Sequence, residues 1–475
     1  MNIVDQIKQE TKQHVNRAAV IEGNRRITYG ELLTAADQFA AFLHQKGVEQ
    51  YDRIGLLCDD SPEYIMVSLA ILSLSAVIVP ISPEQTSEEI DTVIERIDLN
   101  FLIADAKLRS GEYQDTIQPN DFIKKELVFF ERRKKQNHEP EYSLLNPAFI
   151  RFSSGTTGIS KGVVLSHEAI LERTDAANKG LRITSHDIVL WVLSMSYHFV
   201  VTILLFLRRA ATIVLCTSRF PDLFIEGIVQ YHGTFLYASP FHYDLLTTTD
   251  AIESDALRHV RLAISTAMKL PEKTAEAFFS RFGLELTEAY GIIEVGLPFI
   301  KLSGNKEKRG SVGKILPDFT VRLLNPDENG VGEIHIQGKG MLDAYYSPWQ
   351  GREQILSDGW FKTGDLGKID SDGFLFIVGR DKNVINFAGM KVFPEEIESV
   401  LKQHPFVKES RVHGTPHPQY GQLPVATIVL NTGIHDSIVD DLRRFCYHRL
   451  AQYKVPKEFI FTDRLLKTAS GKIKR

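Results

Sequence analysis

The chain has 475 residues, of which 43% are hydrophobic and 24% are charged, as is typical of a soluble globular protein with two or more domains. Its formal net charge of −5 excludes a general attraction to nucleic acid or to an anionic membrane surface. The three cysteines lie far apart and form neither a disulfide framework nor a metal-ligand cluster, which favours a reducing, cytoplasmic location.

Helical and strand patterns alternate over about the first 300 residues. Residues 28–47 predict a helix, because Thr28 and Glu31 have capping-box spacing, apolar residues recur on one face, and Gly47 ends the pattern. Strand patterns occupy residues 52–58, 100–105, 149–153, 211–216 and 261–265, and helical patterns such as 271–283 lie among them. The alternation predicts an α/β fold with a largely parallel sheet covered by helices. From about Gly310 the strand patterns shorten and turns are frequent, which predicts a β-rich subdomain.

Two apolar runs, residues 65–81 and 188–207, have to be considered as membrane spans. The first is slightly short, and the second is interrupted by polar residues between positions 194 and 202. Both are also typical of a buried helix followed by a buried strand, which the β-branched end of the first run favours. The N-terminal stretch lacks the apolar core of a signal peptide. We therefore expect no transmembrane segment.

The segment "FIRFSSGTTGISKGVVLSH" at residues 149–167 gathers hydrogen-bond donors at one bend. Glycine lets backbone N–H groups approach a ligand closely, and hydroxyl groups with the charge of Lys161 suit a polyphosphate. The segment does not match the nucleotide loop G-x-x-x-x-G-K-[S/T], because Ser160 and Gly162 flank Lys161. A simple turn between two apolar runs is the alternative interpretation.

Three later motifs accompany this loop in a fixed order: "AYGIIE" at 289–294, the segment 359–398 that contains "TGDLG" and "GRDKN", and "LKTASGKIKR" at 466–475. Together the four segments resemble the adenylate-forming superfamily of acyl-CoA synthetases, peptide-synthetase adenylation domains and luciferases. The resemblance runs from about Thr28 to the last residue.

The resemblance implies an α/β fold with two domains. The large N-terminal domain, residues 1–380, would combine layered α/β subdomains with a distorted β-barrel subdomain. The small C-terminal domain, residues 381–475, would be α+β and mobile, with its hinge at Asp381.

The implied activity is ATP-dependent activation of a carboxylic acid to acyl-AMP, with release of pyrophosphate, followed by transfer to the thiol of coenzyme A. Two anions must approach each other in the first step, so positive charge and donors are needed where charge develops. The resemblance assigns catalytic roles to Lys161, Glu294 and Lys472, with Glu294 as a ligand of Mg²⁺ and Lys472 bridging the carboxylate and the α-phosphate. The implied ATP- or AMP-binding residues are Ser153, Ser154, Gly155, Thr156, Thr157, Gly158, Tyr290, Gly291, Asp365, Arg380 and Lys382. Of these, Asp365 would accept hydrogen bonds from both ribose hydroxyl groups.

The acid-binding residues that the resemblance implies are His198, Tyr237, Ser239 and Ala289. The stretch "SMSYHFVV" at 194–201 offers no carboxylate for an α-ammonium group, which disfavours a free amino acid and favours a fatty or aryl acid. For His198, a place beside the acid and a place as a hydrogen-bonded core histidine remain alternatives.

The acceptor is predicted from Arg219, which precedes a phenylalanine as does a basic residue of coenzyme A ligases, and which would contact the nucleotide phosphate of coenzyme A. Ala388 and Gly389 would line the channel for the thiol. A phosphopantetheinyl carrier protein is the alternative acceptor. Ile293 stands where the family usually has a threonine that contacts the α-phosphate, so a catalytically impaired nucleotide-binding relative is a third alternative.

Overall fold

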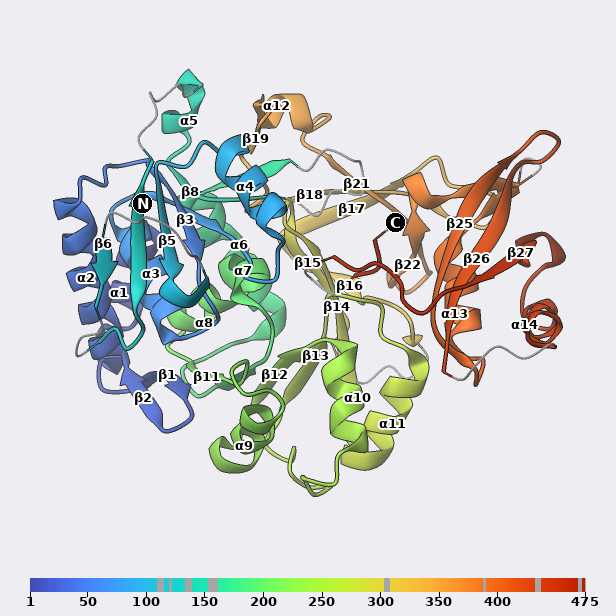
Figure 1. The fold of residues 1–475 in the computed structure, drawn as a ribbon, viewed down its shortest axis with the longest axis horizontal. Coiled ribbons are helices and arrows are strands. Elements are labelled where there is room, and N and C mark those ends of the chain that lie inside the picture. Colours follow the sequence, from blue (N-terminus) through green and yellow to red (C-terminus); the bar gives the residue numbers. More distant parts are fainter. Residues whose placement is uncertain are drawn as a thin grey trace. The chain divides into compact units, whose positions relative to one another are not determined.

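The computed structural model describes residues 1–108, 115–118, 122–132, 139–152, 161–302, 308–387, 390–431, 437–468 and 472–474. The chain divides into two compact units. The first unit comprises Met1–Thr320 and Gln337–Gly359, and the second comprises Val321–Ile336 and Trp360–Arg475. Both units combine sheets with helices (Figure 1). The functional boundary after residue 380 and the hinge at Asp381 stay predictions.

One nine-stranded sheet of the first unit is built around three parallel strands, β3 (Arg53–Leu57), β4 (Val77–Pro80) and β5 (Phe101–Asp105). Its strand order is β20-β19-β9-β8-β4-β3-β5-β7-β6. The outer strands are β6 (Asp115–Ile117), β7 (Leu127–Glu131), β8 (Pro147–Phe152), β9 (Gly162–Ser166), β19 (Ala344–Tyr346) and β20 (Gln350–Gly351). Val93 and Ile94 of helix α4 (Ser87–Arg96) belong to the hydrophobic cluster that covers this sheet.

Helix α2 (Tyr29–Gln45) confirms the helix predicted for residues 28–47. The backbone N–H of Glu31 donates to the Thr28 hydroxyl at 3.2 Å, and the Thr28 N–H donates to the Glu31 carboxylate at 2.8 Å. The capping box read from the sequence is therefore formed, and it satisfies donors that the helix itself leaves without partners.

Both apolar runs contain a helix and a strand, but only the first has them in the predicted order of helix followed by strand, because the second begins with its strand. Residues 65–81 lie in helix α3 (Pro62–Ser73) and strand β4. Residues 188–207 form strand β10 and three short helices in succession, α7 (Met195–His198), a π-helical turn (Phe199–Ile203) and α8 (Leu204–Arg208). Among the described residues, every helix falls short of the length and apolar character that crossing a membrane requires.

A second nine-stranded sheet of the first unit has the order β16-β15-β14-β13-β12-β10-β11-β1-β2. Its strands are β1 (Ala18–Glu22), β2 (Arg25–Thr28), β10 (Ile188–Trp191), β11 (Thr212–Leu215), β12 (Phe235–Ala238), β13 (Leu262–Ser265), β14 (Leu286–Ile292), β15 (Gly296–Ile300) and β16 (Lys314–Ile315). The strands from β1 to β14 in this order pair in parallel. Parallel pairing requires helical crossovers, which matches the alternation of the sequence.

Three helices pack against the strands of the second sheet. Helices α9 (Asp222–Tyr231), α10 (Pro240–Thr248) and α11 (Glu272–Phe282) contribute Phe224, Tyr243 and Phe278 to one hydrophobic cluster with the strands (Figure 1). The remaining helices of the unit are α1 (Ile3–Glu10), α5 (Pro140–Leu144), α6 (His167–Leu181) and α12 (Arg352–Ile355). The long α6 supplies a buried arginine to the candidate site.

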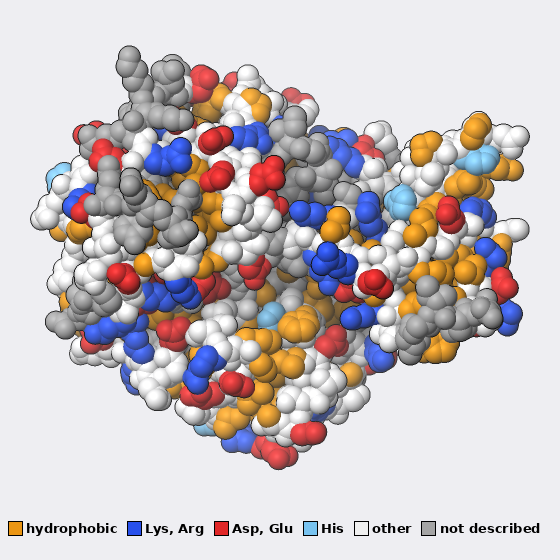
Figure 2. Space-filling view, viewed as in Figure 1, with side chains coloured by type: hydrophobic (Ala, Val, Ile, Leu, Met, Phe, Trp, Pro, Cys, Tyr) orange, Lys and Arg blue, Asp and Glu red, His pale blue; other side chains and the backbone are white. Residues whose placement is uncertain are grey.

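The second unit contains two sheets. A four-stranded sheet has the order β17 (Phe319–Leu324), β18 (Gly332–Gly338), β21 (Phe361–Ile369) and β22 (Leu375–Arg380), and it corresponds to the β-rich subdomain expected after Gly310. The other sheet consists of β23 (Ile385–Phe387), β24 (Met390–Val392), β25 (Val407–His417), β26 (Gly421–Leu430) and β27 (Glu458–Phe461). Helices α13 (Pro394–Leu401) and α14 (Ile438–Tyr447) pack on it through Ile397 and Leu442. On the face that Figure 2 shows, Lys and Arg side chains lie among Asp and Glu side chains.

Candidate active site

The motif at 289–294 lies at the carboxyl end of β14 and in the turn that leads into β15. Strand β14 pairs in parallel with β13 and antiparallel with β15, with Tyr290 opposite Phe299 and ring centroids 6.2 Å apart. A Cβ on Gly291 would lie 2.4 Å from the carbonyl oxygen of Gly296, so the close turn requires glycine there. Glu294 is half-buried in this turn. The structure thus brings Ala289, Tyr290, Gly291 and Glu294 to one end of the sheet.

Lys161 and Glu294 are joined through Tyr345. The Lys161 ammonium lies 4.7 Å from the centre of the Tyr345 ring and donates to Oε1 of Gln350 at 2.8 Å. The Tyr345 hydroxyl donates to Oε1 of Glu294 at 3.5 Å. Burial raises the pKa of the Tyr345 phenol and the Glu294 charge raises it further, so this hydroxyl is a donor at neutral pH. Two residues with predicted catalytic roles therefore contact one aromatic side chain.

Strand pairing fixes this arrangement. Lys161 directly precedes β9, and β9 pairs antiparallel with β19, where Tyr345 lies opposite Val163. Tyr345 in turn lies opposite Gln350 across the β19–β20 hairpin. The predicted phosphate-binding residues Ser153, Ser154, Gly155, Thr156, Thr157 and Gly158 lie outside the described residues.

Arg173 of α6 holds the segment before Glu294 to the segment before Tyr345. Its fully buried guanidinium donates from Nη1 to the carbonyl oxygen of Ile293 at 3.1 Å, and from Nε and Nη2 to that of Gly340 at 2.9 and 2.5 Å. Burial lowers the pKa of Arg173 to about 10, although the charges of nearby carboxylates, including Glu294, oppose the shift. Gly340 has φ +66°, and a Cβ there would lie 2.4 Å from the backbone nitrogen of Arg173, so this close approach requires glycine.

Sequence reasoning missed Arg173, Tyr345 and a third residue, Arg151. The backbone N–H of Leu342 also donates to the carbonyl oxygen of Glu294 at 2.7 Å, so the two segments are tied at several points. Arg151 is the last residue but one of β8 and donates to the carbonyl oxygen of Tyr197. Burial lowers the pKa of Arg151, although the Glu294 charge opposes the shift. Nothing in the spacing of these residues distinguishes them from ordinary surface or core residues.

The predicted acid-binding residues His198 and Tyr237 lie together beside Trp191. The Trp191 and Tyr237 rings are stacked with centroids 5.8 Å apart, on the paired strands β10 and β12. The His198 ring contacts both, with centroids 6.2 Å from Trp191 and 6.2 Å from Tyr237. Trp191, which the sequence did not single out, is fully buried. The group forms an aromatic cluster with one imidazole.

Ser239 is the residue before helix α10, and its hydroxyl lies 2.8 Å from Nδ1 of His242. Burial lowers the pKa of His242 to about 4, so the imidazole is neutral at physiological pH. This hydroxyl therefore contacts a side chain in the first turn of α10, and the predicted contact of Ser239 with the acid stays a prediction.

Asp365 and Arg380 of the second unit are paired across neighbouring strands. They lie opposite each other on β21 and β22, and Nε of Arg380 is 2.9 Å from Oδ1 of the buried Asp365. Lys382 and Asp381 follow in an exposed 3₁₀ turn, with Asp381 3.9 Å from the Lys362 ammonium. The two predicted nucleotide contacts in β21 and β22 are thus neighbours.

The remaining predicted residues are Lys472, Arg219, Ala388 and Gly389. Lys472 is exposed in a turn where the Thr468 N–H donates to its carbonyl oxygen at 2.7 Å. Arg219 of the first unit is largely exposed, with Nη2 3.8 Å from Oε2 of Glu226. Ala388 and Gly389 lie outside the described residues.

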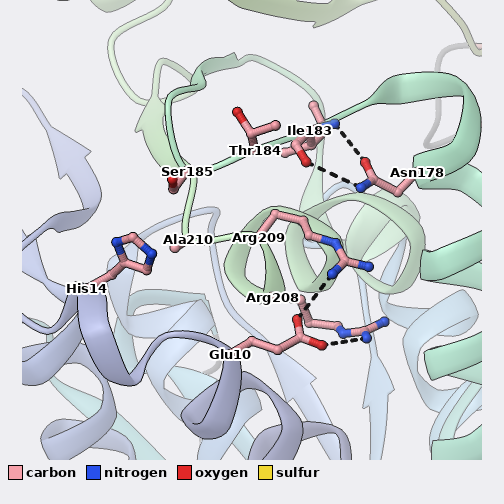
Figure 3. A pocket seen from close by; sticks show the side chains of 9 residues that line it. All are labelled: Glu10, His14, Asn178, Ile183, Thr184, Ser185, Arg208, Arg209 and Ala210. Atoms are coloured by element: carbon pink, nitrogen blue, oxygen red, sulfur yellow. Dashed lines mark hydrogen bonds and ion pairs between the residues drawn. The ribbon is translucent and has the colours of Figure 1, made fainter.

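A surface pocket of about 470 Å³ lies elsewhere in the first unit (Figure 3). Glu10, Arg208 and Arg209 line it, and Nη2 of Arg208 is 2.7 Å from Oε1 of Glu10. Its two arginines face carboxylates, since Asp175 also contacts both of them. None of the predicted site residues lines this pocket.

Comparison with known proteins identifies the family. The model of the AMP-binding enzyme family matches residues 7–346, and the model of the AMP-binding enzyme C-terminal domain matches residues 396–472. The chain belongs to the AMP-binding enzyme family, which confirms the resemblance read from the four motifs.

Relatives and a solved structure extend over the whole chain. A long-chain-fatty-acid–CoA ligase of Yersinia pestis is 27% identical, with 100% of this chain and 93% of the relative covered. An indoleacetate–CoA ligase of Aromatoleum aromaticum is 25% identical, with 100% and 97% covered. The crystal structure of the ATP-bound RpMatB-BxBclM chimera B1 superposes with a TM-score of 0.85 at 25% identity, with 100% and 97% covered. This likeness confirms the predicted α/β fold with a large N-terminal and a small C-terminal part.

Proposed function

We propose that the chain is an AMP-forming acid–thiol ligase. A carboxylate oxygen of the acid attacks the α-phosphate of ATP, which gives acyl-AMP and pyrophosphate. The thiol of coenzyme A then attacks the acyl carbonyl, which gives an acyl thioester, AMP and a proton. The observation that carries the proposal is the meeting of Lys161 and Glu294 at Tyr345 in a chain of the AMP-binding enzyme family.

Lys161 supplies positive charge on the phosphate side of this site. It directly follows residues 153–160, whose hydroxyl groups and backbone amides we propose as ligands of the β- and γ-phosphates. A preorganised ammonium group that does not have to reorient as charge develops is the kind of group that stabilises phosphoryl transfer.

Glu294 fits a role in holding Mg²⁺ together with ATP. Among the described residues there is no group of three or more His, Cys, Asp or Glu side chains that could hold an ion alone. Mg²⁺ in nucleotide enzymes commonly takes one or two protein carboxylates and completes its shell with substrate phosphates and water. A single glutamate near a phosphate-binding lysine matches that donor set, and the ion, when bound, would offset phosphate charge.

The nucleoside end of ATP is assigned to Asp365, with Arg380, Lys382, Tyr290 and Gly291 as further contacts. A buried carboxylate held by an arginine can accept hydrogen bonds from two ribose hydroxyl groups while its charge stays compensated. Lys472 serves the adenylation step, and its exposed position fits a side chain that is needed in only one of two half-reactions. A mobile segment 381–475 with a hinge at Asp381 belongs to the same proposal.

The acid is fatty or aryl, and it binds beside four residues, His198, Tyr237, Ser239 and Ala289. The aromatic cluster of Trp191, Tyr237 and His198 offers an apolar wall, and the 27% and 25% identical relatives are named for a long-chain fatty acid and for indoleacetate. We also propose a cytoplasmic location, because all three cysteines are buried free thiols.

The test is acid-dependent ATP–pyrophosphate exchange over a panel of fatty, aryl and amino acids. Exchange with one class of apolar acid is expected, and absence of exchange with every acid would favour a catalytically impaired relative. Ile293 leaves the site without the usual threonine, so the Ile293→Thr variant belongs in the same assay and is expected to be at least as active as the parent.

The acceptor is decided by a second assay. Arg219→Ala should leave exchange unchanged, raise the KM for coenzyme A several-fold, and scarcely affect dephospho-coenzyme A, because a guanidinium contact to the 3′-phosphate is about 1.5–3 kcal/mol. If a phosphopantetheinylated carrier protein is acylated and coenzyme A is not, the acceptor is a protein partner. The assignment of Arg219, Ala388 and Gly389 as contacts of coenzyme A would then be wrong.

A further inference from the structure

Tyr345 contacts both charged groups on which the proposed ATP site depends. The face of its ring lies under the Lys161 ammonium at 4.7 Å, and its hydroxyl donates to Glu294 at 3.5 Å. The ring contact and the hydroxyl contact use different atoms. They can therefore be removed separately.

The ring contact orients Lys161. A cation over an aromatic face is attracted by the ring quadrupole, and the attraction is stronger where water is excluded. Tyr345 is 9% exposed, and the Lys161 ammonium has a second fixed partner in Gln350 at 2.8 Å. Because Tyr345 and Gln350 lie opposite each other on the β19–β20 hairpin, one hairpin supplies both anchors of the lysine.

The hydroxyl contact orients Glu294. The backbone of Glu294 is already fixed, since its carbonyl oxygen accepts from the Leu342 N–H at 2.7 Å and the preceding carbonyl accepts from Arg173. The direction of the carboxylate oxygens depends on the rotational freedom about the side-chain bonds of a glutamate. A phenolic donor from the neighbouring strand restricts that freedom and directs one oxygen.

We propose that Tyr345 is a positioning residue that holds the Lys161 ammonium through its ring and the Glu294 carboxylate through its hydroxyl before ATP and Mg²⁺ bind. This inference rests on the proposed function, because it assigns the phosphates to Lys161 and the metal to Glu294. The ring then governs affinity for ATP alone, and the hydroxyl governs the additional effect of Mg²⁺.

Three variants separate the two contacts. Tyr345→Phe keeps the ring and removes the hydroxyl, whereas Tyr345→Leu removes both. Tyr346→Phe is the matched control, because Tyr346 lies on the same strand but its ring packs against Tyr142 and Trp349 instead. Thermal unfolding of each variant measures any general loss of structure.

The measurements are calorimetric titrations of ATP with and without Mg²⁺, together with the Mg²⁺ dependence of ATP–pyrophosphate exchange. Tyr345→Phe should bind metal-free ATP with the affinity of the parent. The factor by which Mg²⁺ raises the affinity for ATP should be about threefold or more smaller in this variant than in the parent. The variant should also need a correspondingly higher Mg²⁺ concentration for half-maximal exchange. Tyr345→Leu should in addition bind metal-free ATP about threefold or more weakly. Tyr346→Phe should match the parent in both titrations.

Equal behaviour of Tyr345→Phe and the parent towards Mg²⁺, or equal metal-free ATP affinity of Tyr345→Leu and the parent, would overturn the inference. If the parent shows the predicted titrations but exchanges pyrophosphate with no acid, the proposed function fails and the positioning role stands. If the parent exchanges pyrophosphate and Tyr345→Phe is indistinguishable from it, the positioning role fails and the proposed function stands. Absence of ATP binding by the parent would overturn both.

Discussion

Nη1 of Arg173 donates to the carbonyl oxygen of Ile293 at 3.1 Å, although the two residues are 120 positions apart in the sequence. The same guanidinium donates twice to Gly340. A buried helix residue therefore sets the distance between the turn that carries Glu294 and the strand that carries Tyr345. The geometry of the candidate site depends on a side chain that need not contact any substrate.

Replacing Arg173 tests this dependence. Arg173→Met leaves two buried carbonyl oxygens without their donors, so we expect a loss of about 2–4 kcal/mol in stability and at least a tenfold slower exchange at a temperature where the variant is folded. Lys179→Met is the control, because Lys179 is on the same helix and its side chain, which is 46% exposed, forms an ion pair with Asp318. A folded Arg173→Met variant with the parent's exchange rate would contradict the role of this residue.

The pairing of Asp365 with Arg380 leads to a prediction about the ribose. Asp365→Asn should raise the KM for ATP about tenfold and leave the KM for the acid unchanged, because only the nucleoside contact loses a charged acceptor. The exposed Asp372 in the turn between the same two strands provides the control variant Asp372→Asn. The parent should also use 2′-deoxy-ATP poorly, and indifference to the 2′-hydroxyl would remove Asp365 from the site.

Lys472 is expected to separate the two half-reactions. The backbone of Lys472 forms two hydrogen bonds with Thr468, and Lys472→Ala leaves both of these backbone groups in place. Formation of acyl-AMP should fall by about 100-fold or more, whereas transfer from supplied acyl-AMP to coenzyme A should persist. Lys474→Ala should resemble the parent in both assays. A similar loss in both half-reactions of Lys472→Ala would be inconsistent with a role in adenylation alone.

A pH prediction follows from Glu288 on β14. Burial raises the pKa of its carboxyl from the ordinary value of 4.5 to about 7, although the charges of Lys301 and Lys269 oppose the shift. Because the folded state then binds more protons than the unfolded state, this group makes stability fall as the pH rises from 4.5 to about 7. Thermal or urea unfolding measures the free energy of unfolding at each pH. Between about pH 5 and pH 8, this free energy should fall by about 2 kcal/mol less in Glu288→Gln than in the parent.

The exposed Glu272 of α11 provides the control for that measurement. Glu272→Gln should keep the pH dependence of the parent. Parallel profiles of the parent and Glu288→Gln would show that the Glu288 carboxyl does not change its protonation in this range.

The sequence predicted the local features of the fold well. The capping box of Thr28 and Glu31 and the buried interpretation of residues 65–81 depend on neighbours within one or two turns of chain, and both were confirmed. The motif residues Lys161 and Glu294 could be found because their segments carry recognisable patterns. Asp365 and Arg380 were found separately, and only the register of β21 with β22 makes them partners.

Other parts of the site could not be predicted from local patterns. The contact of Arg173 with Gly340 spans 167 positions, and that of Lys161 with Gln350 spans 189. In the sequence, Trp191 is only the last residue of an apolar strand pattern. The pairing of β10 with β12 in the structure stacks its ring on that of Tyr237. These contacts follow from strand order and register, which a single sequence does not specify.

The central claim is that an oxygen atom of the acid attacks the α-phosphate of ATP. The most direct measurement uses an acid labelled with ¹⁸O in both carboxylate oxygens, together with ATP, Mg²⁺ and coenzyme A, and determines the mass of the AMP formed. Attack on the α-phosphate followed by thiol attack on the acyl carbonyl leaves one ¹⁸O in AMP and one in the thioester. Thioester formation with unlabelled AMP, or with ¹⁸O in inorganic phosphate and ADP as the nucleotide product, would contradict the account.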